Sequence, residues 1–215
     1  MNLFHITTFE KPRQTLLIPR VPEESMSTEN ITIERVSFSD SISGCIFGLG
    51  NSDKINVGDQ IRVYRIDILE NDDSLYLPHE LYYNGWVNDA TLSNEYWYTQ
   101  PIIPSDYYEY EVKELKTKRF IVVAASEIET VKNFLESEKI LIPGDADICH
   151  FINDSLNIDQ KIRLKKYLTE EKEENKSTED VYYKIFGEKR KKTSEDFEYK
   201  YDEFTYISDC ILEKI

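Results

Sequence analysis

The sequence predicts an α+β protein, and three observations support this fold class. Residues 60–68 alternate regularly between polar and apolar side chains, as expected for a strand with one buried face. Other strand patterns fall in the first 124 residues, whereas the chain from about residue 144 onward reads as helices. Strands gathered in one part and helices in another favour α+β over alternating strands and helices. We therefore expect two regions, residues 1–143 and an acidic helical region over residues 144–215.

The predicted strands share an apolar–polar alternation or a dense run of β-branched and aromatic side chains. They cover residues 3–7, 31–38, 60–68, 95–98, 108–115 and 119–124. Proline residues shape the paths between them, because Pro19 and Pro22 hold their neighbours extended and Pro101 ends the strand before it. The Asn84–Gly85 pair predicts a hairpin turn, and the basic residues 116–118 predict a turn between the last two strands.

Predicted helices follow from apolar spacings of three and four residues together with capping residues. They cover residues 43–48, 126–138, 159–173 and 179–186, with a last helix after Ser194 that carries Phe197, Phe204, Ile207 and Ile211. Ser39, Asp40 and Ser41 lie where the second strand leads into the first helix. Such a turn gathers hydroxyls, free amides and positive dipole potential, which suits a phosphate or a ribose. The same residues are also expected at an ordinary capped junction.

The charge balance is strongly acidic, with 41 Asp and Glu against 26 Lys and Arg and a formal net charge of −15. This excludes a general nucleic-acid binder, because such proteins need a basic face to displace counterions. It leaves two interpretations open. The acidity could imitate phosphate toward a basic partner, or it could serve solubility alone.

The three cysteines are widely spaced and form neither a CxxC pair nor a metal-binding cluster, so we expect thiols and no metal site. Thiols of this kind are typical of a reducing cytoplasm. The first residues lack a basic segment followed by a long apolar one, and no run approaches the ~20 apolar residues of a membrane helix. We therefore expect a cytoplasmic protein that does not engage a membrane.

Three segments of the strand-rich region, taken in order, resemble one family. They are Leu3–Thr7 with His5, Val36–Cys45 with Phe38, and Ser93–Tyr98 with Glu95. Together they resemble the histidine–aromatic–glutamate arrangement of the diphtheria-toxin-like ADP-ribosyltransferases, which include the poly(ADP-ribose) polymerases. The resemblance covers roughly residues 1–120 and implies a split antiparallel sheet. The chain also resembles small phage and Gram-positive bacterial proteins that share the segments seen here at residues 3–6, 19–22 and 35–39.

The resemblance implies NAD as a substrate and gives Glu95 and His5 the catalytic roles. Glycosyl transfer from NAD passes through an oxocarbenium-like centre, which a carboxylate at the ribose stabilises. Glu95 would hold the 2′-hydroxyl of that ribose, and His5 would bind the other ribose. The residues implied to bind NAD are Thr7 beside His5, Phe38 stacked on nicotinamide, Ser39 and Ser41 along the same wall, and Arg20 and Arg35 at the diphosphate.

The chain departs from the family at two of these positions. The glycine usual after the histidine is Ile6, and the second-strand tyrosine is Phe38, which stacks but cannot donate a hydrogen bond. Alternatives without chemistry also stand. His5 could be bonded to backbone at a strand end, and Glu95 could be an exposed carboxylate at the start of a strand. A fold that kept its shape and lost turnover is a third interpretation.

Two functions from different classes follow. The first is an NAD-dependent ADP-ribosyltransferase-like protein that modifies a protein or nucleic-acid target in phage–bacteria conflict. In a toxin–antitoxin pair, such a protein would be the toxin. The second is a catalytically inactive acidic binding protein that inhibits or recognises a defence-system partner through its C-terminal helices. The ordered set His5, Phe38 and Glu95 carries the first, and the net charge of −15 carries the second.

Overall fold

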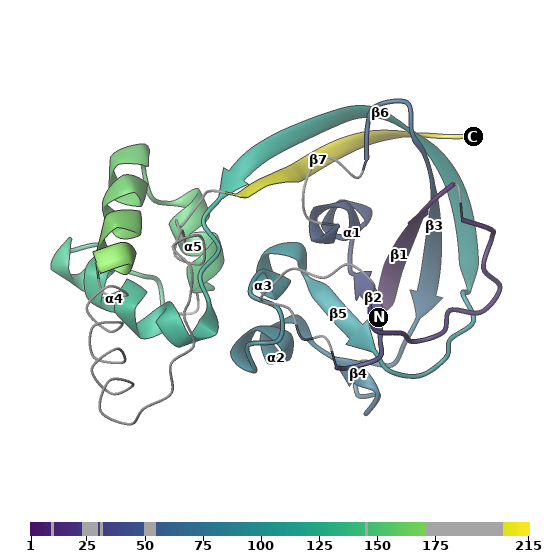
Figure 1. Ribbon diagram of the computed structural model, residues 1–215, viewed down its shortest axis with the longest axis horizontal. Helices are drawn as coiled ribbons and strands as arrows, with labels where there is room; N and C mark the ends of the chain where they lie inside the picture. The colour runs from purple at the N-terminus through teal and green to yellow at the C-terminus, as the bar shows by residue number, and fades with distance from the viewer. Residues whose placement is uncertain (10, 23–29, 31, 50–54, 145, 171–203) are drawn as a thin grey trace, which may run out of the picture. The chain divides into compact units, whose positions relative to one another are not determined.

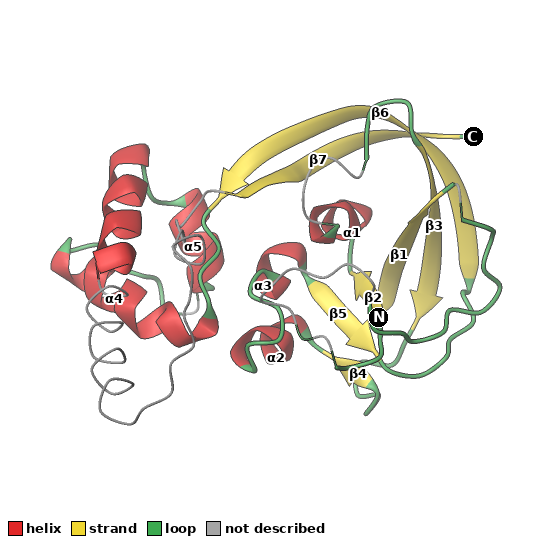
Figure 2. Cartoon of the chain, in the orientation of Figure 1, coloured by secondary structure: helices red, strands yellow, loops and turns green. Residues whose placement is uncertain are grey.

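The computed structural model describes residues 1–215 except 10, 23–29, 31, 50–54, 145 and 171–203. It divides the chain into two compact units, each considered by itself. The first unit contains Met1–Ser126 and Phe204–Ile215, and the second contains Glu127–Glu203. The predicted α+β class is confirmed, because the described chain combines an antiparallel sheet with several helices (Figure 2). The boundary lies elsewhere than at residue 143, since residues 204–215 return to the first unit.

A seven-stranded sheet organises the first unit, with the strand order β4-β5-β2-β1-β3-β6-β7 (Figure 1). Its strands are β1 Asn2–Thr8, β2 Val36–Ser39, β3 Gln60–Asp67, β4 Leu75–Tyr76, β5 Glu95–Tyr98, β6 Asp106–Phe120 and β7 Phe204–Lys214. Every recorded pairing between neighbours is antiparallel. β1 and β3 pair over their length, whereas the recorded register between β1 and β2 is a single pair, Phe4 with Ser39.

The centre of the sheet is buried on both faces. Side chains of alternate residues point to opposite faces, and a cluster of buried apolar residues lies on each. One core cluster contains Leu3, Leu17, Val36, Phe38, Ile66, Ile68 and Leu75. The other contains Ile6, Ile46, Ile55, Ile61, Val63, Val112 and Ile207. The alternation in β1 therefore divides it between two cores, with Leu3 in one cluster and Ile6 in the other.

Helix α1, Ile42–Gly48, covers the second of these faces and begins as its sequence predicts. Ser41 is the N-cap, and its hydroxyl accepts a hydrogen bond from the amide of Gly44 at 3.0 Å. This satisfies one of the amides that a helix start leaves without an intrahelical partner. Two short helices, α2 Pro78–Tyr83 and α3 Ala90–Ser93, follow before β5.

The described part of the second unit is helical (Figure 2). It contains α4 Ile128–Ser137, α5 Ile148–Asp154 and a helical stretch over residues 158–170. A 3-10 turn over Ala125–Glu127 leads into α4, so the α-helix begins two residues later than predicted. Val131, Phe134 and Leu135 are buried on one face of α4, as apolar spacings of three and four residues predict for a helix. The rings of Phe134 and Tyr167 lie 5.6 Å apart.

The last predicted helix is wrong for residues 204–214, which form strand β7. Phe204, Ile207 and Ile211 fall at helical spacing, but the pairing of β7 with β6 contains two register shifts. A bulge changes which side chains face the core, so a bulged strand loses its strict alternation. The predicted helix over 179–186, the start after Ser194 and Phe197 lie outside the described residues.

Two predicted turns are also wrong. Residues 116–118 lie within one continuous strand, β6, and pair with β7 (Figure 1), where Lys116 contacts Asp209 at 3.2 Å. A cross-strand ion pair therefore accounts for Lys116. Asn84 and Gly85 end helix α2, and the left-handed φ of +67° at Gly85 fits a residue without a Cβ. The predicted second strand is shorter than expected, because the Asn30 side chain holds the amides of Thr32 and Ile33 in a turn.

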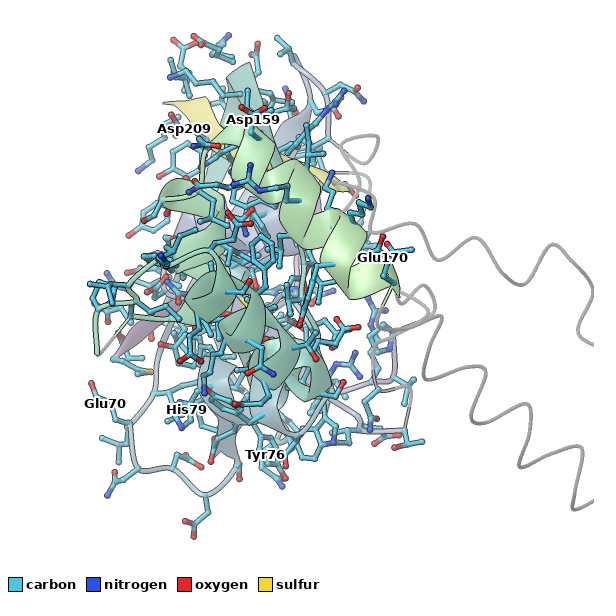
Figure 3. All side chains as sticks on the ribbon, turned by 90° about the vertical axis from the view of Figure 1, so that its left-hand side faces the viewer. Glu70, Tyr76, His79, Asp159, Glu170 and Asp209 are labelled. Atoms are coloured by element: carbon cyan, nitrogen blue, oxygen red, sulfur yellow. The ribbon has the colours of Figure 1, made fainter. Side chains whose placement is uncertain are left out.

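Acidic side chains project from the surfaces of both units, among them those of Glu70, Asp159, Glu170 and Asp209 (Figure 3). Among the described residues, no helix has the length and apolar content needed to cross a bilayer.

Candidate active site at the β1–β2 divergence

The strand order brings together three segments that are far apart in the sequence. β5, β2 and β1 are consecutive neighbours in the sheet, and they carry Glu95, Phe38 and His5 respectively (Figure 1). Ser39 pairs with Glu95 across β2 and β5, and Ser39 also pairs with Phe4 across β2 and β1. The three predicted positions therefore lie within one stretch of the sheet.

A cavity of about 780 Å³ lies where β1 and β2 stop pairing. Its volume is on the scale of sites for small molecules and cofactors. Four of the predicted site residues line it, namely His5, Thr7, Arg20 and Arg35. Ile6 and Thr8, the neighbours of Thr7 in β1, also line it.

The imidazole of His5 bridges β1 and β2 at the point where the two strands separate. Its Nδ1 lies 2.9 Å from the carbonyl oxygen of Ser37 and donates to it, which leaves Nε2 as an acceptor in the neutral ring. Burial lowers the pKa of His5, and the nearby Arg20 and Lys11 lower it further, although the bond to Ser37 opposes them. His5 is therefore neutral near pH 7 and can accept a hydrogen bond from a hydroxyl.

Thr7 lies two residues along β1 and is 9% exposed. Its hydroxyl oxygen is buried and has no hydrogen-bond partner among the described residues. Buried hydroxyls are normally paired, because burying an unpaired polar group costs free energy. The Thr7 hydroxyl oxygen is thus a buried polar atom without a described partner, in a residue that lines the cavity.

The two predicted arginines differ in what their side chains do. Their backbones form a two-way bridge, with both amide-to-carbonyl distances at 3.1 Å. The guanidinium of Arg35 is buried, donates to the carbonyls of Asn30 and Ile33, and stacks on the Trp97 ring at 3.7 Å. Arg20 is exposed at the cavity rim. Arg20 is therefore better placed than Arg35 to meet an anion.

Glu95 follows a residue in a strained backbone conformation. Asn94 has a left-handed φ of 48°, and the Ser39 hydroxyl donates to the carbonyl of Ser93 at 2.8 Å. Helix α1 packs tightly here, because a Cβ on Gly44 would lie 2.5 Å from the Ser93 carbonyl oxygen. These contacts fix the turn that leads into β5. The Glu95 carboxylate then accepts a hydrogen bond from Trp97 Nε1 at 2.7 Å.

Glu95 does not line the cavity, and its pairing with Ser39 puts it on the face opposite to Phe38. His5 shares the face of Phe38, as their ring contact at 5.9 Å indicates. The imidazole of His5 and the carboxylate of Glu95 thus lie on opposite faces of the sheet. Ser37 lines the cavity, and Ser39, the partner of Glu95, lies two residues further along β2, about 7 Å away in a strand. Glu95 therefore lies just outside the cavity.

Three predicted binding residues are occupied elsewhere and do not line the cavity. Phe38 is 2% exposed and packs in the first core cluster, so its ring does not present a face to a ligand. Ser41 caps α1, and Ser39 donates to Ser93. Their local roles are the ones that capping and packing predict for these residue types.

The sequence interpretation missed Lys11, Gln14 and Ser37, which line the cavity. Ser37 could have been found, because in an alternating strand it faces opposite to the apolar Val36 and Phe38. Nothing in the sequence marks Lys11 and Gln14. They are brought to the cavity by a non-local bond to the sheet, in which the Gln14 amide donates to the Tyr64 hydroxyl at 3.0 Å.

Two other kinds of site, a metal centre and a cysteine nucleophile, find no support in the described residues. No group of three His, Cys, Asp or Glu side chains there could hold a metal ion. Burial raises the pKa of the Cys45 thiol strongly, so this cysteine is a neutral packing residue rather than a nucleophile. Its sulfur lies 2.9 Å from the carbonyl oxygen of Phe4.

Comparisons with family models, with curated proteins and with solved structures each find no match to the chain.

Proposed function

We propose that this protein is an NAD-dependent ADP-ribosyltransferase-like protein with an ADP-ribosyltransferase-like split sheet, acting on a protein or nucleic-acid target in phage–bacteria conflict. One observation carries the proposal. A cavity of nucleotide-binding size lies at the divergence of β1 and β2 and is lined by His5, Thr7, Arg20 and Arg35. Residues predicted from separate parts of the sequence as one NAD site thus share one cavity.

The proposed ligand lies in this cavity. The adenosine ribose lies at His5, where Nε2 accepts from a hydroxyl, and the diphosphate lies toward Arg20. The nicotinamide ribose lies toward Ser37, which is two residues along β2 from Ser39, the partner of Glu95.

The proposed reaction breaks the bond between C1′ of the ribose and the nicotinamide nitrogen. A nucleophile of the target attacks C1′, nicotinamide leaves with the bonding electron pair, and the nucleophile releases its proton to water. Glu95 binds the 2′-hydroxyl and stabilises the positive charge that develops at C1′. Its bond from Trp97 Nε1 orients the carboxylate.

The test is transfer of label from NAD to target or to the protein itself, with Glu95→Gln as the decisive variant. The amide oxygen can still accept from Trp97, so the fold is preserved while the negative charge is removed. We expect at least a hundredfold loss of transfer. Glu114→Gln is the matched control, because Glu114 is an exposed residue of β6, and it should transfer as the wild type does. Equal transfer by wild type and Glu95→Gln would refute the proposed role of Glu95.

A second candidate is a binding protein that kept the cavity and lost turnover. Phe38 is buried in the core and cannot stack on nicotinamide, and Glu95 does not line the cavity. The net charge of −15 fits a charge-led contact with a basic defence-system partner. A pull-down followed by a salt titration tests this candidate, since association that is indifferent to salt would contradict a charge-led contact.

A further inference from the structure

Arg35 lines the cavity, but its side chain is directed at protein groups. It is 2% exposed, and its Nη1 donates to the carbonyls of Asn30 and Ile33 at 2.8 Å and 3.0 Å. Its guanidinium carbon lies 3.7 Å from the centroid of the Trp97 ring. Arg35 therefore connects the cavity wall with the residue that bonds Glu95, just outside the cavity.

The Trp97 ring is held by several contacts. It is fully buried, and its Nε1 donates to the Glu95 carboxylate at 2.7 Å, the short end of the range for such bonds. The Trp86 ring lies parallel to it, with 3° between the planes and 6.1 Å between the centroids. The Trp86 carbonyl accepts from the amide of Asn30, whose own carbonyl accepts from Arg35. These four residues thus form a closed ring of contacts, which limits how far the indole can turn.

The charge of Arg35 strengthens the bond that the indole makes to Glu95. A cation over an aromatic face is attracted by the electron density of the ring. It draws that density toward itself, so the indole N–H becomes more positive and a better donor. The acceptor is a carboxylate, and hydrogen bonds to charged acceptors are shorter and stronger than neutral ones. In a buried stack such effects are large, because the local dielectric is low.

We infer that Arg35 is a positioning residue: through the Trp97 ring, its guanidinium fixes the Glu95 carboxylate in the orientation that the reaction needs. The inference rests on the proposed function, in which Glu95 stabilises the positive charge at C1′. It gives Arg35 a role other than the diphosphate contact that the resemblance implies. The two roles predict different kinetics, because a diphosphate contact holds NAD in the ground state, whereas a positioned carboxylate acts in the transition state.

Steady-state transfer from NAD by the full chain carrying Arg35→Met separates the two roles. Methionine is unbranched and apolar, so it can still pack on the Trp97 ring but carries no charge. We expect kcat to fall by at least about tenfold and KM for NAD to stay within about twofold of the wild type. Arg35→Lys keeps a cation over the ring and should retain most of kcat. A raised KM with unchanged kcat in Arg35→Met would overturn the inference in favour of a diphosphate contact.

Two further variants complete the kinetic series. Trp97→Phe keeps an aromatic ring next to Arg35 but removes the N–H donor, so it should lower kcat as Arg35→Met does. Unchanged kcat in Trp97→Phe would overturn the inference even if Arg35→Met does not fold. Arg163→Met is the matched control, because Arg163 is exposed in the second unit and pairs with Glu138 at 2.7 Å, and it should have wild-type kinetics.

The indole N–H resonances provide a measurement that does not need transfer. The chain has two tryptophans, Trp86 and Trp97, so its nitrogen–proton correlation spectrum contains two indole signals, which Trp86→Phe assigns. We expect the Trp97 proton signal to move upfield in Arg35→Met and in Glu95→Gln, because both changes weaken the bond from Nε1. Arg163→Met should leave this signal in place.

The outcomes distinguish the inference from the proposed function. A Trp97 signal that is unchanged in Arg35→Met would overturn the inference even if the protein transfers ADP-ribose. A signal that moves upfield in both Arg35→Met and Glu95→Gln, in a protein that transfers nothing, would support the orientation of Glu95 by Arg35 and refute the proposed function.

Discussion

The two sides of the candidate site are built in opposite ways. At the divergence of β1 and β2, the Thr7 hydroxyl and the charges of Lys11 and Arg20 have no partners within the described chain. At the corner where α1 meets β5, the backbone is held tightly. Ser39 holds Ser93, and Gly44 leaves no room for a methyl group. A site prepared for a ligand keeps polar groups unsatisfied, whereas a corner that positions one carboxylate satisfies them internally.

The largest expected effect on the free energy of unfolding comes from a substitution at the corner where α1 meets β5. Gly44→Ala places a Cβ 2.1 Å from the Ser39 hydroxyl oxygen and 2.5 Å from the Ser93 carbonyl oxygen. The hydroxyl can rotate away, but the carbonyl belongs to the backbone turn before Glu95, so α1 and β5 must separate. Overpacking of this kind costs about 1–3 kcal/mol of the free energy of unfolding. Chemical denaturation in urea measures it.

The same helix supplies the control for this prediction. A Cβ on Gly48 meets only the Ser93 Cβ at 3.8 Å, which is ordinary contact. Gly48→Ala should therefore be neutral or stabilise the protein by up to about 1 kcal/mol, because alanine has the higher helix propensity. Equal destabilisation by both substitutions would show that the close approach at Gly44 is not what holds the corner.

The two sides also differ in how far the sequence could predict them. Local signals predicted the Ser41 cap, strand β3 and the position of His5 in β1, because each depends on neighbours in the chain. The alternation of its own segment puts Phe38 on the apolar face, whereas its pairing with Tyr96 is non-local and could not be predicted from that segment. The opposite faces of His5 and Glu95 follow from two such registers, β1 with β2 and β2 with β5.

Longer-range features were harder still. Strand β7 pairs with β6 from almost a hundred residues away along the chain, and its register shifts erased the alternation that would have marked it. Lys11 reaches the cavity because Arg62, in β3, holds its carbonyl. Such bonds leave no periodic trace in the sequence, and they explain why the wall of the cavity was only partly predicted.

The effect of intermediate size concerns the cavity side, and it is the pH dependence of the free energy of unfolding. Burial holds the pKa of His5 below its ordinary value, so the unfolded chain binds this proton more tightly than the folded protein does. Stability is therefore fully present above pH 6.5 and falls as the pH drops below it, by up to about 1.4 kcal/mol per pH unit. His5→Asn should remove this part of the slope between pH 6.5 and 5, measured by urea denaturation. His79→Asn, at an exposed position, should keep it. An unchanged slope in His5→Asn would contradict a buried neutral imidazole.

The smallest expected effect concerns the buried Thr7 hydroxyl on the cavity side. Thr7→Val replaces this unpaired hydroxyl by a methyl group of similar size, so we expect the protein to gain about 1 kcal/mol in the free energy of unfolding. Thr7→Ser keeps the hydroxyl and should lose some stability, because the methyl group is missing. Urea denaturation measures both variants. Loss of stability in Thr7→Val would instead mean that the hydroxyl already has a partner in the free protein.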